Sequence, residues 1–194
     1  MGPGWATART LNRLPQLMHR ISLARIDIRS GPGDRRRGWI AAGSLRIVVA
    51  LGRGGIKADK READGATPAG RFRPVRLWWR KDRSLRPLSR LSARPIDPAD
   101  GWCEDPADRR YNRPIRLEPG AAGDRLTRSD ALYDLIIEID HNTRPRIAGR
   151  GSAVFIHVAR PGLSATAGCI AMPAPALKRL LWRIGRNTRI VIHV

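Results

Sequence analysis

Apolar and polar residues alternate along much of this chain in short runs, the pattern of half-buried β-strands. Such runs lie at residues 22–29, 38–42, 45–51, 71–80, 132–140, 152–158 and 187–194. Gly43 and Ser44 separate two of them and predict the turn of a β-hairpin. Pro74 lies inside another run and favours a sheet edge or a bulge, because proline cannot donate to a strand ladder. We therefore expect a mostly β (α+β) domain.

A single stretch near the C-terminus has helical spacing instead. Residues 173–184 begin with prolines, place leucines three and four positions apart, and stop at Gly185. Prolines at the start and a glycine just after the end are typical of a helix. The chain contains no internal repeat or interdomain linker, so residues 21–194 are expected to form one domain, preceded by a leader at 1–20 that is weakly helical or disordered.

A long irregular insertion is predicted between the strands. Six prolines interrupt residues 81–119, too many for long regular elements. Insertions of this length in a compact domain often act as lids or binding loops. Trp102 and Tyr111 lie within it and are candidate substrate contacts, although a small core beneath the loop would also explain them.

Charge and hydropathy narrow the classes of partner. The 194 residues carry a net charge of +20, almost all of it from arginine. An anionic partner such as nucleic acid, a membrane surface or an acidic polymer would suit that charge, but scattered arginines are more often ordinary solvated residues. The chain has no zinc finger, aromatic RNA motif or clear recognition helix, so we predict no nucleic-acid partner. No apolar run approaches ~18 residues, so no membrane span is expected.

Two residues could carry nucleophilic chemistry together. His157 ends one apolar run, and Cys169 opens the next after eleven intervening residues, several of them turn formers. A histidine within hydrogen-bond reach can take the proton of a thiol, and a loop of this length can fold back far enough. Separately, each residue could simply be a buried core residue. Cys103 stands beside Glu104 and Asp105, which disfavour a thiolate, and no disulfide between the two cysteines is expected.

Two motifs around this pair resemble a known family. Residues 67–72 (TPAGRF) match the pattern T-P-x-G-x-F, and residues 166–172 (TAGCIAM), downstream of His157, resemble [S/T]-H-G-C-[I/V]-R-[M/L]. In this order, with strands around them, they resemble the L,D-transpeptidase catalytic domain, or YkuD fold, over residues 45–194. The chain departs from the family pattern at Ala167 and Ala171, where histidine and arginine are usual, and its His–Cys gap is shorter.

The resemblance implies a YkuD-like mixed β-sandwich or barrel and a cysteine peptidyltransferase. It implies that Cys169 attacks an L,D-peptide bond of a peptidoglycan stem peptide, that His157 transfers the protons, and that the Val158 carbonyl orients its ring. Backbone amides at Gly168 and Cys169 would hold the oxyanion. His141 would support the site in place of the missing histidine. Thr166 and Arg160 join the two insertion aromatics as predicted substrate contacts.

Several alternatives stay open from the sequence. An amine acceptor would make the protein a transpeptidase, and water would make it an L,D-carboxypeptidase or amidase. A non-catalytic basic protein that only binds peptidoglycan or nucleic acid is a third reading. A zinc site built from His141, His157 and Cys169 is a fourth, but no metal-binding spacing supports it, so we predict neither metal nor cofactor.

The cellular location and the assembly state are also left as expectations. The family resemblance implies a periplasmic or cell-envelope location. Residues 1–20 show no apolar core of a secretory signal, which leaves a cytoplasmic role open. We expect a monomer.

Overall fold

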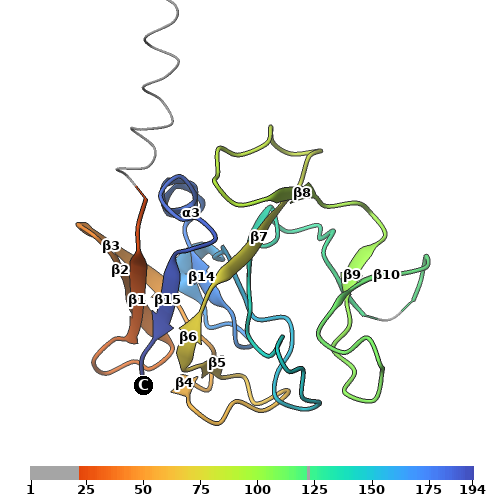
Figure 1. Ribbon diagram of the computed structural model, residues 1–194, viewed down its shortest axis with the longest axis horizontal. Helices are drawn as coiled ribbons and strands as arrows, with labels where there is room; N and C mark the ends of the chain where they lie inside the picture. Colours follow the sequence, from red (N-terminus) through yellow and green to blue (C-terminus); the bar gives the residue numbers. More distant parts are fainter. Residues whose placement is uncertain (1–21, 122) are drawn as a thin grey trace, which may run out of the picture.

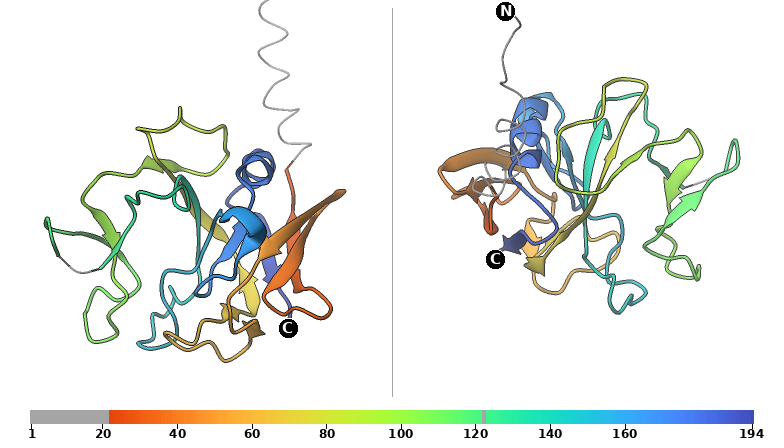
Figure 2. Two further views of the ribbon diagram at one scale, coloured as in Figure 1. Left: turned by 180° about the vertical axis from the view of Figure 1, so that it is seen from behind. Right: turned by 45° about the horizontal axis from the view of Figure 1, so that its top comes forward.

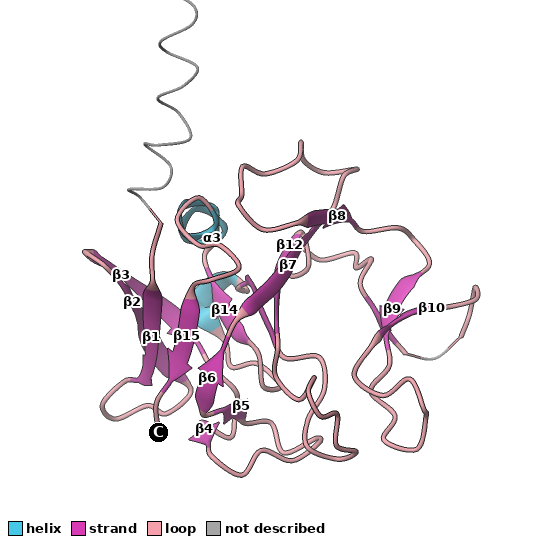
Figure 3. Cartoon of the chain, in the orientation of Figure 1, coloured by secondary structure: helices cyan, strands magenta, loops and turns pink. Residues whose placement is uncertain are grey.

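The computed structural model describes residues 22–121 and 123–194, so the predicted leader at 1–20 lies outside the described residues (Figure 1). The strands are β1 (Arg25–Ser30), β2 (Arg37–Ala42), β3 (Leu45–Ala50), β4 (Ile56–Lys57), β5 (Thr67–Pro68), β6 (Gly70–Phe72), β7 (Pro74–Trp79), β8 (Ala93–Pro95), β9 (Asp100–Trp102), β10 (Pro114–Arg116), β11 (Asp124–Arg125), β12 (Leu135–Ile139), β13 (Phe155–Val158), β14 (Ile170–Met172) and β15 (Arg189–Ile192). A 3₁₀ turn, η1 (Pro161–Leu163), and a helix, α3 (Ala174–Leu181), complete the elements. The described residues thus confirm a mostly β chain with one α-helix (Figure 3).

Ten strands form one large curled sheet in the order β6-β15-β1-β2-β3-β14-β13-β12-β7-β8 (Figure 2). The predicted hairpin is present, with β2 and β3 antiparallel and joined through Gly43 and Ser44. The parallel pair β13 and β14 lies near the middle of the sheet and places Ile156 beside Ile170. Two segments that flank the loop from 159 to 169 are therefore neighbours in the sheet.

The main core lies on the face of the sheet that α3 covers. Alternate residues of the strands, such as Ile26 and Ile28 of β1, are fully buried there. The helix contributes Leu177, Leu180 and Leu181, which recur at helical spacing and are also fully buried. The predicted helical stretch is confirmed because its apolar stripe has this sheet face to cover.

A second apolar cluster lies around Trp78, Phe155 and Cys169. The insertion reaches it with Trp102, whose ring packs edge-on against Phe155 at a centroid distance of 4.9 Å. Strands β9 and β10 of the insertion form a small sheet with β11, which follows it in the chain, and this sheet stands apart from the large sheet in Figure 1. The cysteine thus lies where the sheet meets the insertion.

The predicted strand at 71–80 is divided in the structure. β6 pairs with β15, while β7 lies between β12 and β8, so β7 is not an edge strand. The register of β7 against β12 shifts opposite Pro74, which confirms the bulge that the proline favoured. Within the described residues, no helix is both long enough and apolar enough to cross a bilayer.

Candidate active site

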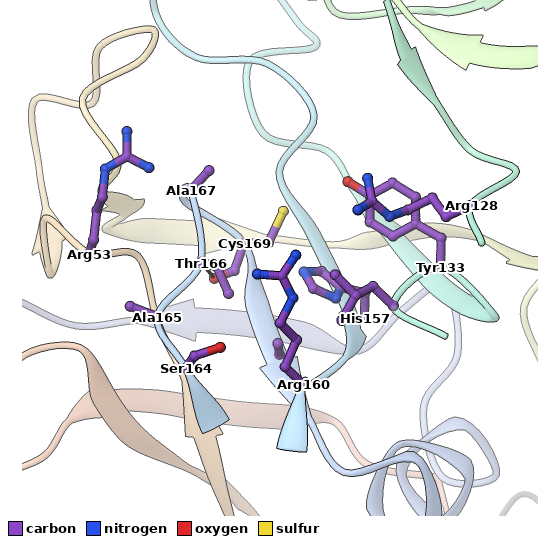
Figure 4. Close-up of a pocket in the computed structure, with 12 residues that line it drawn as sticks. Arg53, Arg128, Tyr133, His157, Arg160, Ser164, Ala165, Thr166, Ala167 and Cys169 are labelled. Carbon is purple, nitrogen blue, oxygen red and sulfur yellow. Dashed lines mark hydrogen bonds between the residues drawn. The ribbon is translucent and has the colours of Figure 1, made fainter. Parts of the chain in front are cut away.

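Strand register brings the predicted nucleophile and base onto one face. In the β13–β14 pair His157 stands opposite Ala171, and Cys169 immediately precedes β14. Because side chains alternate across a strand, His157, Cys169 and Ala171 project to the same side. Figure 4 shows the sulfur and the imidazole entering one pocket from neighbouring segments. The pocket measures about 330 Å³, and both residues line it.

The imidazole of His157 is held in one orientation. Its Nδ1 lies 2.8 Å from the carbonyl oxygen of Val158, the contact that the family resemblance implied. A carbonyl only accepts hydrogen bonds, so Nδ1 carries the proton and Nε2 is left as an acceptor. Burial lowers the pKa of His157 to about 4, so the ring is neutral at physiological pH. A neutral ring with an unprotonated Nε2 is competent as a base.

Tyr133 fixes the same imidazole from the side. Its ring meets the His157 ring edge-on at a centroid distance of 5.5 Å, and its hydroxyl donates to Asp124 Oδ2 at 3.1 Å. The guanidinium of Arg128 lies 5.2 Å from the centre of the Tyr133 ring. Packing and a hydrogen bond thus hold in place the aromatic wall against which the histidine rests.

The thiol of Cys169 is protonated at rest. It donates to the carbonyl of Ala153 at 3.1 Å and accepts from the amide of Phe155 at 3.4 Å. Burial raises its pKa to about 12. The resting pair is therefore a neutral thiol and a neutral imidazole.

Two threonine hydroxyls hold the backbone of the cysteine. Thr166 Oγ1 donates to the Cys169 carbonyl at 2.7 Å and accepts from the Gly168 amide at 3.1 Å. Thr67 Oγ1 approaches the same carbonyl at 3.5 Å and accepts from the amide of Gly52 at 2.9 Å. The first motif, which begins at Thr67, therefore meets the second motif directly behind Cys169.

Gly168 allows this close approach. Its φ of +148° is a backbone conformation that other residues rarely adopt, and a Cβ there would come within 2.9 Å of the Ala66 carbonyl oxygen. Two amides were expected to hold an oxyanion, and one of them, that of Gly168, already donates a hydrogen bond to Thr166 Oγ1. The Cys169 amide remains the other candidate.

A buried ion pair supports the loop from behind. Lys60 Nζ lies 2.6 Å from Asp64 Oδ1, and the two side chains are only 6% and 12% exposed. Asp64 also accepts from the amides of Ala66 and Arg61. A Cβ built on Gly168 would lie 3.7 Å from Lys60 Cε, so the lysine stem packs against the glycine before the nucleophile.

Positive charge dominates the pocket wall. Three guanidinium groups line the pocket, those of Arg53, Arg128 and Arg160, and no carboxylate is among its lining residues. Arg128 is paired with Asp130 at 2.8 Å. Among the described residues, neither Arg53 nor Arg160 has an acidic partner within ion-pair distance. Figure 4 shows the guanidinium of Arg160 beside Cys169 and His157, with Arg53 farther away beyond Ala167.

The other predicted site residues lie outside this pocket. His141 is partly buried, with Nε2 3.1 Å from the Arg150 carbonyl oxygen and its ring against Phe72, and burial lowers its pKa. It does not line the pocket, so the structure does not bring it together with His157 and Cys169. In residues 22–121 and 123–194 no group of three His, Cys, Asp or Glu side chains is arranged to hold a metal ion.

The insertion aromatics are structural in this conformation. Trp102 is buried and donates through Nε1 to Asn112 Oδ1 at 3.1 Å, while the hydroxyl of the buried Tyr111 donates to Glu62. Neither lines the pocket, whereas Thr166 and Arg160 do. The small-core explanation therefore describes the two aromatics better than substrate contact does. Cys103 is also buried and free, and burial raises its pKa.

Sequence reasoning missed Arg53, Arg128 and Tyr133. Arg53 follows β3, and Tyr133 stands just before β12, so both lie at strand ends that the apolar pattern had located. Only the order of strands in the sheet shows that these ends converge on the cysteine.

Comparison with known proteins agrees with the motifs and the geometry. The family model for the L,D-transpeptidase catalytic domain, YkuD, matches residues 31–192. No curated protein and no solved structure matches the chain significantly. Members of this family act on peptidoglycan peptides and are typically associated with the cell envelope. On the extent of the match, the chain belongs to the YkuD family of L,D-transpeptidase catalytic domains.

Proposed function

We propose that this protein is a cysteine peptidyltransferase that acts on peptidoglycan stem peptides in the cell envelope, with Cys169 as nucleophile and His157 as general base and acid. One observation supports this most strongly. A neutral imidazole, anchored through Nδ1 to Val158, shares an open pocket and one sheet face with a thiol. That arrangement suits proton transfer coupled to attack, rather than storage of a thiolate.

In the first half-reaction the sulfur leaves its hydrogen bond to Ala153 and attacks the carbonyl carbon of the L,D-peptide bond. The thiol proton passes to Nε2 of His157 as the carbon–sulfur bond forms. We assign stabilisation of the oxyanion to the amide of Cys169, because the Gly168 amide already donates to Thr166 Oγ1. His157 then gives its proton to the leaving nitrogen, the carbon–nitrogen bond breaks, and the D-amino acid departs to leave a thioester.

In the second half-reaction an amine attacks the thioester. His157 takes a proton from the amine, the new amide bond forms, and the sulfur leaves and regains a proton. Water in place of the amine would release a free carboxylate instead. The protein residues are the same in both cases, so the acceptor alone decides between transpeptidation and trimming.

The arginines of the pocket bind the stem peptide that serves as acyl donor. Stem peptides carry free carboxylates, and a guanidinium binds a carboxylate through two parallel hydrogen bonds. Arg160 and Arg53 line the pocket without an acidic partner among the described residues. We assign them this role because Ala171, where the family usually has arginine, brings no charge to the pocket.

Product analysis tests the proposal. Purified protein is incubated with a tetrapeptide muropeptide, and products are separated by liquid chromatography with mass detection. We expect either a crosslinked dimer or a tripeptide, lost in Cys169→Ala and retained in Cys103→Ala, which removes the other buried free cysteine. Wild-type protein that forms neither product would instead favour a family member that only binds peptidoglycan.

A further inference from the structure

The end of the molecule formed by α3 and the β7–β8 connection carries an apolar surface that the proposed chemistry does not use. Leu85 is 93% exposed, Leu88 is 73% exposed and Trp182 is 49% exposed. The two leucines lie on the connection, and the tryptophan ends the helix, yet all three line one shallow hollow of about 530 Å³. Figures 1 and 2 show the connection and the helix at the same end of the molecule.

Exposure of large apolar side chains in a cluster is unusual and marks contact surfaces. On the opposite side of α3, by contrast, Leu177, Leu180 and Leu181 are fully buried. The same helix therefore has one face packed on the sheet and one end with an uncovered tryptophan. We call the surface formed by Leu85, Leu88 and Trp182 the Leu85–Trp182 surface.

Cations surround the Leu85–Trp182 surface. Lys178 and Arg179 line the hollow, and Lys81 and Arg86 are exposed on the same connection. No carboxylate lines the hollow, and Asp82 nearby is already paired with Arg80 at 2.6 Å. Lys178, Arg179 and Arg86 have no acidic partner among the ion pairs of the described residues.

We propose that the Leu85–Trp182 surface docks the protein peripherally onto a bilayer that contains anionic lipid. Leucine and tryptophan side chains bounded by lysine and arginine are the composition of surfaces that lie in the headgroup region. The aliphatic stems of Lys178 and Arg179 can follow the apolar residues inward while their charges meet lipid phosphates. A protein partner with a neutral or basic edge would not match this rim of cations.

The proposal is independent of the catalytic assignment, since it uses no residue of the Cys169 pocket. It also requires no membrane-spanning segment. For an enzyme whose substrate lies next to a membrane, such a contact would raise the local concentration of substrate around the enzyme.

Vesicle co-sedimentation of the full-length protein tests the surface. Vesicles of phosphatidylcholine alone are compared with vesicles that also contain phosphatidylglycerol. We expect binding to the anionic vesicles, weakened about tenfold both in Leu85→Ser/Leu88→Ser and in Lys178→Gln/Arg179→Gln. Matched controls are Ile147→Ser, an exposed apolar residue elsewhere, and Lys57→Gln/Arg109→Gln, which removes the same charge away from the surface.

The outcomes separate docking from general charge attraction. Weakening by the two surface variants but not by the controls supports the proposal. Equal weakening by both charge variants, with no effect of the leucine changes, would show nonspecific attraction by the net charge and overturn it. Absence of binding to anionic vesicles would also overturn it and leave a protein partner as the explanation for the exposed leucines. Circular dichroism of each variant confirms that these exposed substitutions leave the fold intact.

Discussion

His157 and Ala171 stand opposite each other on the parallel strands β13 and β14, and both line the pocket that holds the thiol. The family usually has arginine at the position of Ala171, so in this chain the side chain facing the histidine is a methyl group. The guanidinium groups of the pocket come from other segments, Arg53 after β3 and Arg160 after β13. The positive charge of the pocket therefore comes from segments outside the cysteine motif.

Because Arg160 rather than residue 171 brings a guanidinium to the pocket, we predict the result of a rescue experiment. Arg160→Ala should raise the KM for a tetrapeptide donor about tenfold, because one charge-assisted contact to a carboxylate is lost. Adding Ala171→Arg to that variant should recover part of the loss, since it returns a guanidinium to the same pocket. Arg109→Ala, an exposed arginine far from the pocket, is the control. An unchanged KM in Arg160→Ala would contradict the role in recognition.

The resting protonation state predicts how alkylation of the nucleophile depends on pH. With the pKa of Cys169 raised to about 12, the thiolate fraction should increase about tenfold per pH unit across the neutral range. The rate of iodoacetamide labelling, measured in a Cys103→Ala background, should therefore rise steadily from pH 6 to about pH 9. A rate that levels off near neutral pH would show a preformed thiolate and contradict the neutral pair.

Burial of His157 predicts a loss of stability in acid. Its pKa is about 4 when folded, below the ordinary value of 6.5, so the unfolded chain binds the proton first as the pH falls. The contribution of His157 to the free energy of unfolding is complete above pH 6.5. It falls by roughly 3 kcal/mol as the pH falls toward 4. Urea unfolding at several pH values should show a shallower acid loss in His157→Gln. Identical slopes in the two proteins would contradict the shifted pKa.

The ion pair behind the nucleophile should matter far more than an exposed one nearby. Lys60→Met leaves Asp64 buried without its cation, and we expect a loss of ~3 kcal/mol in unfolding free energy together with reduced activity. Arg61→Met breaks the exposed pair with Asp59 and should change stability by less than ~1 kcal/mol. Equal effects of the two substitutions, measured by urea unfolding, would rule out the supporting role of Lys60.

Gly168 offers a test of the close approach behind the thiol. Gly168→Ala adds a Cβ within 2.9 Å of the Ala66 carbonyl oxygen, so the loop must shift and activity should fall by more than about tenfold. Gly162→Ala is the matched control: its φ is also positive, at +77°, but a Cβ there meets nothing within 4 Å. The control should lose only ~1 kcal/mol of stability and keep its activity. Comparable activity losses in both variants would attribute the effect to backbone strain alone.

The sequence predicted the main strands of the large sheet, the helix, and the shared location of His157 and Cys169. Alternation located the strands, proline and glycine bounded α3, and the turn at Gly43 and Ser44 fixed the hairpin. The motifs identified His157 and Cys169, and the resemblance implied the contact of His157 with Val158 that the structure contains. These features are local, because each is encoded by residues that are close in the chain.

The walls of the site were not predictable in the same way. Arg53 and Tyr133 reach the pocket only because β3, β14, β13 and β12 are neighbours in the sheet, and strand order is a long-range property. Trp102 and Tyr111 were candidate substrate contacts by residue type, yet they are buried, with hydrogen bonds to Asn112 and Glu62, and do not line the pocket. The burial that keeps the thiol of Cys169 protonated also results from packing, which the motif does not record.

The most direct test of the central claim is intact-mass measurement after brief mixing with a tetrapeptide muropeptide, followed by peptide mapping. The account predicts a mass increase equal to the donor without its terminal D-amino acid, mapped to Cys169, present in Cys103→Ala and strongly reduced in His157→Ala. An adduct on Cys103, or turnover by a Cys169→Ala protein, would contradict it.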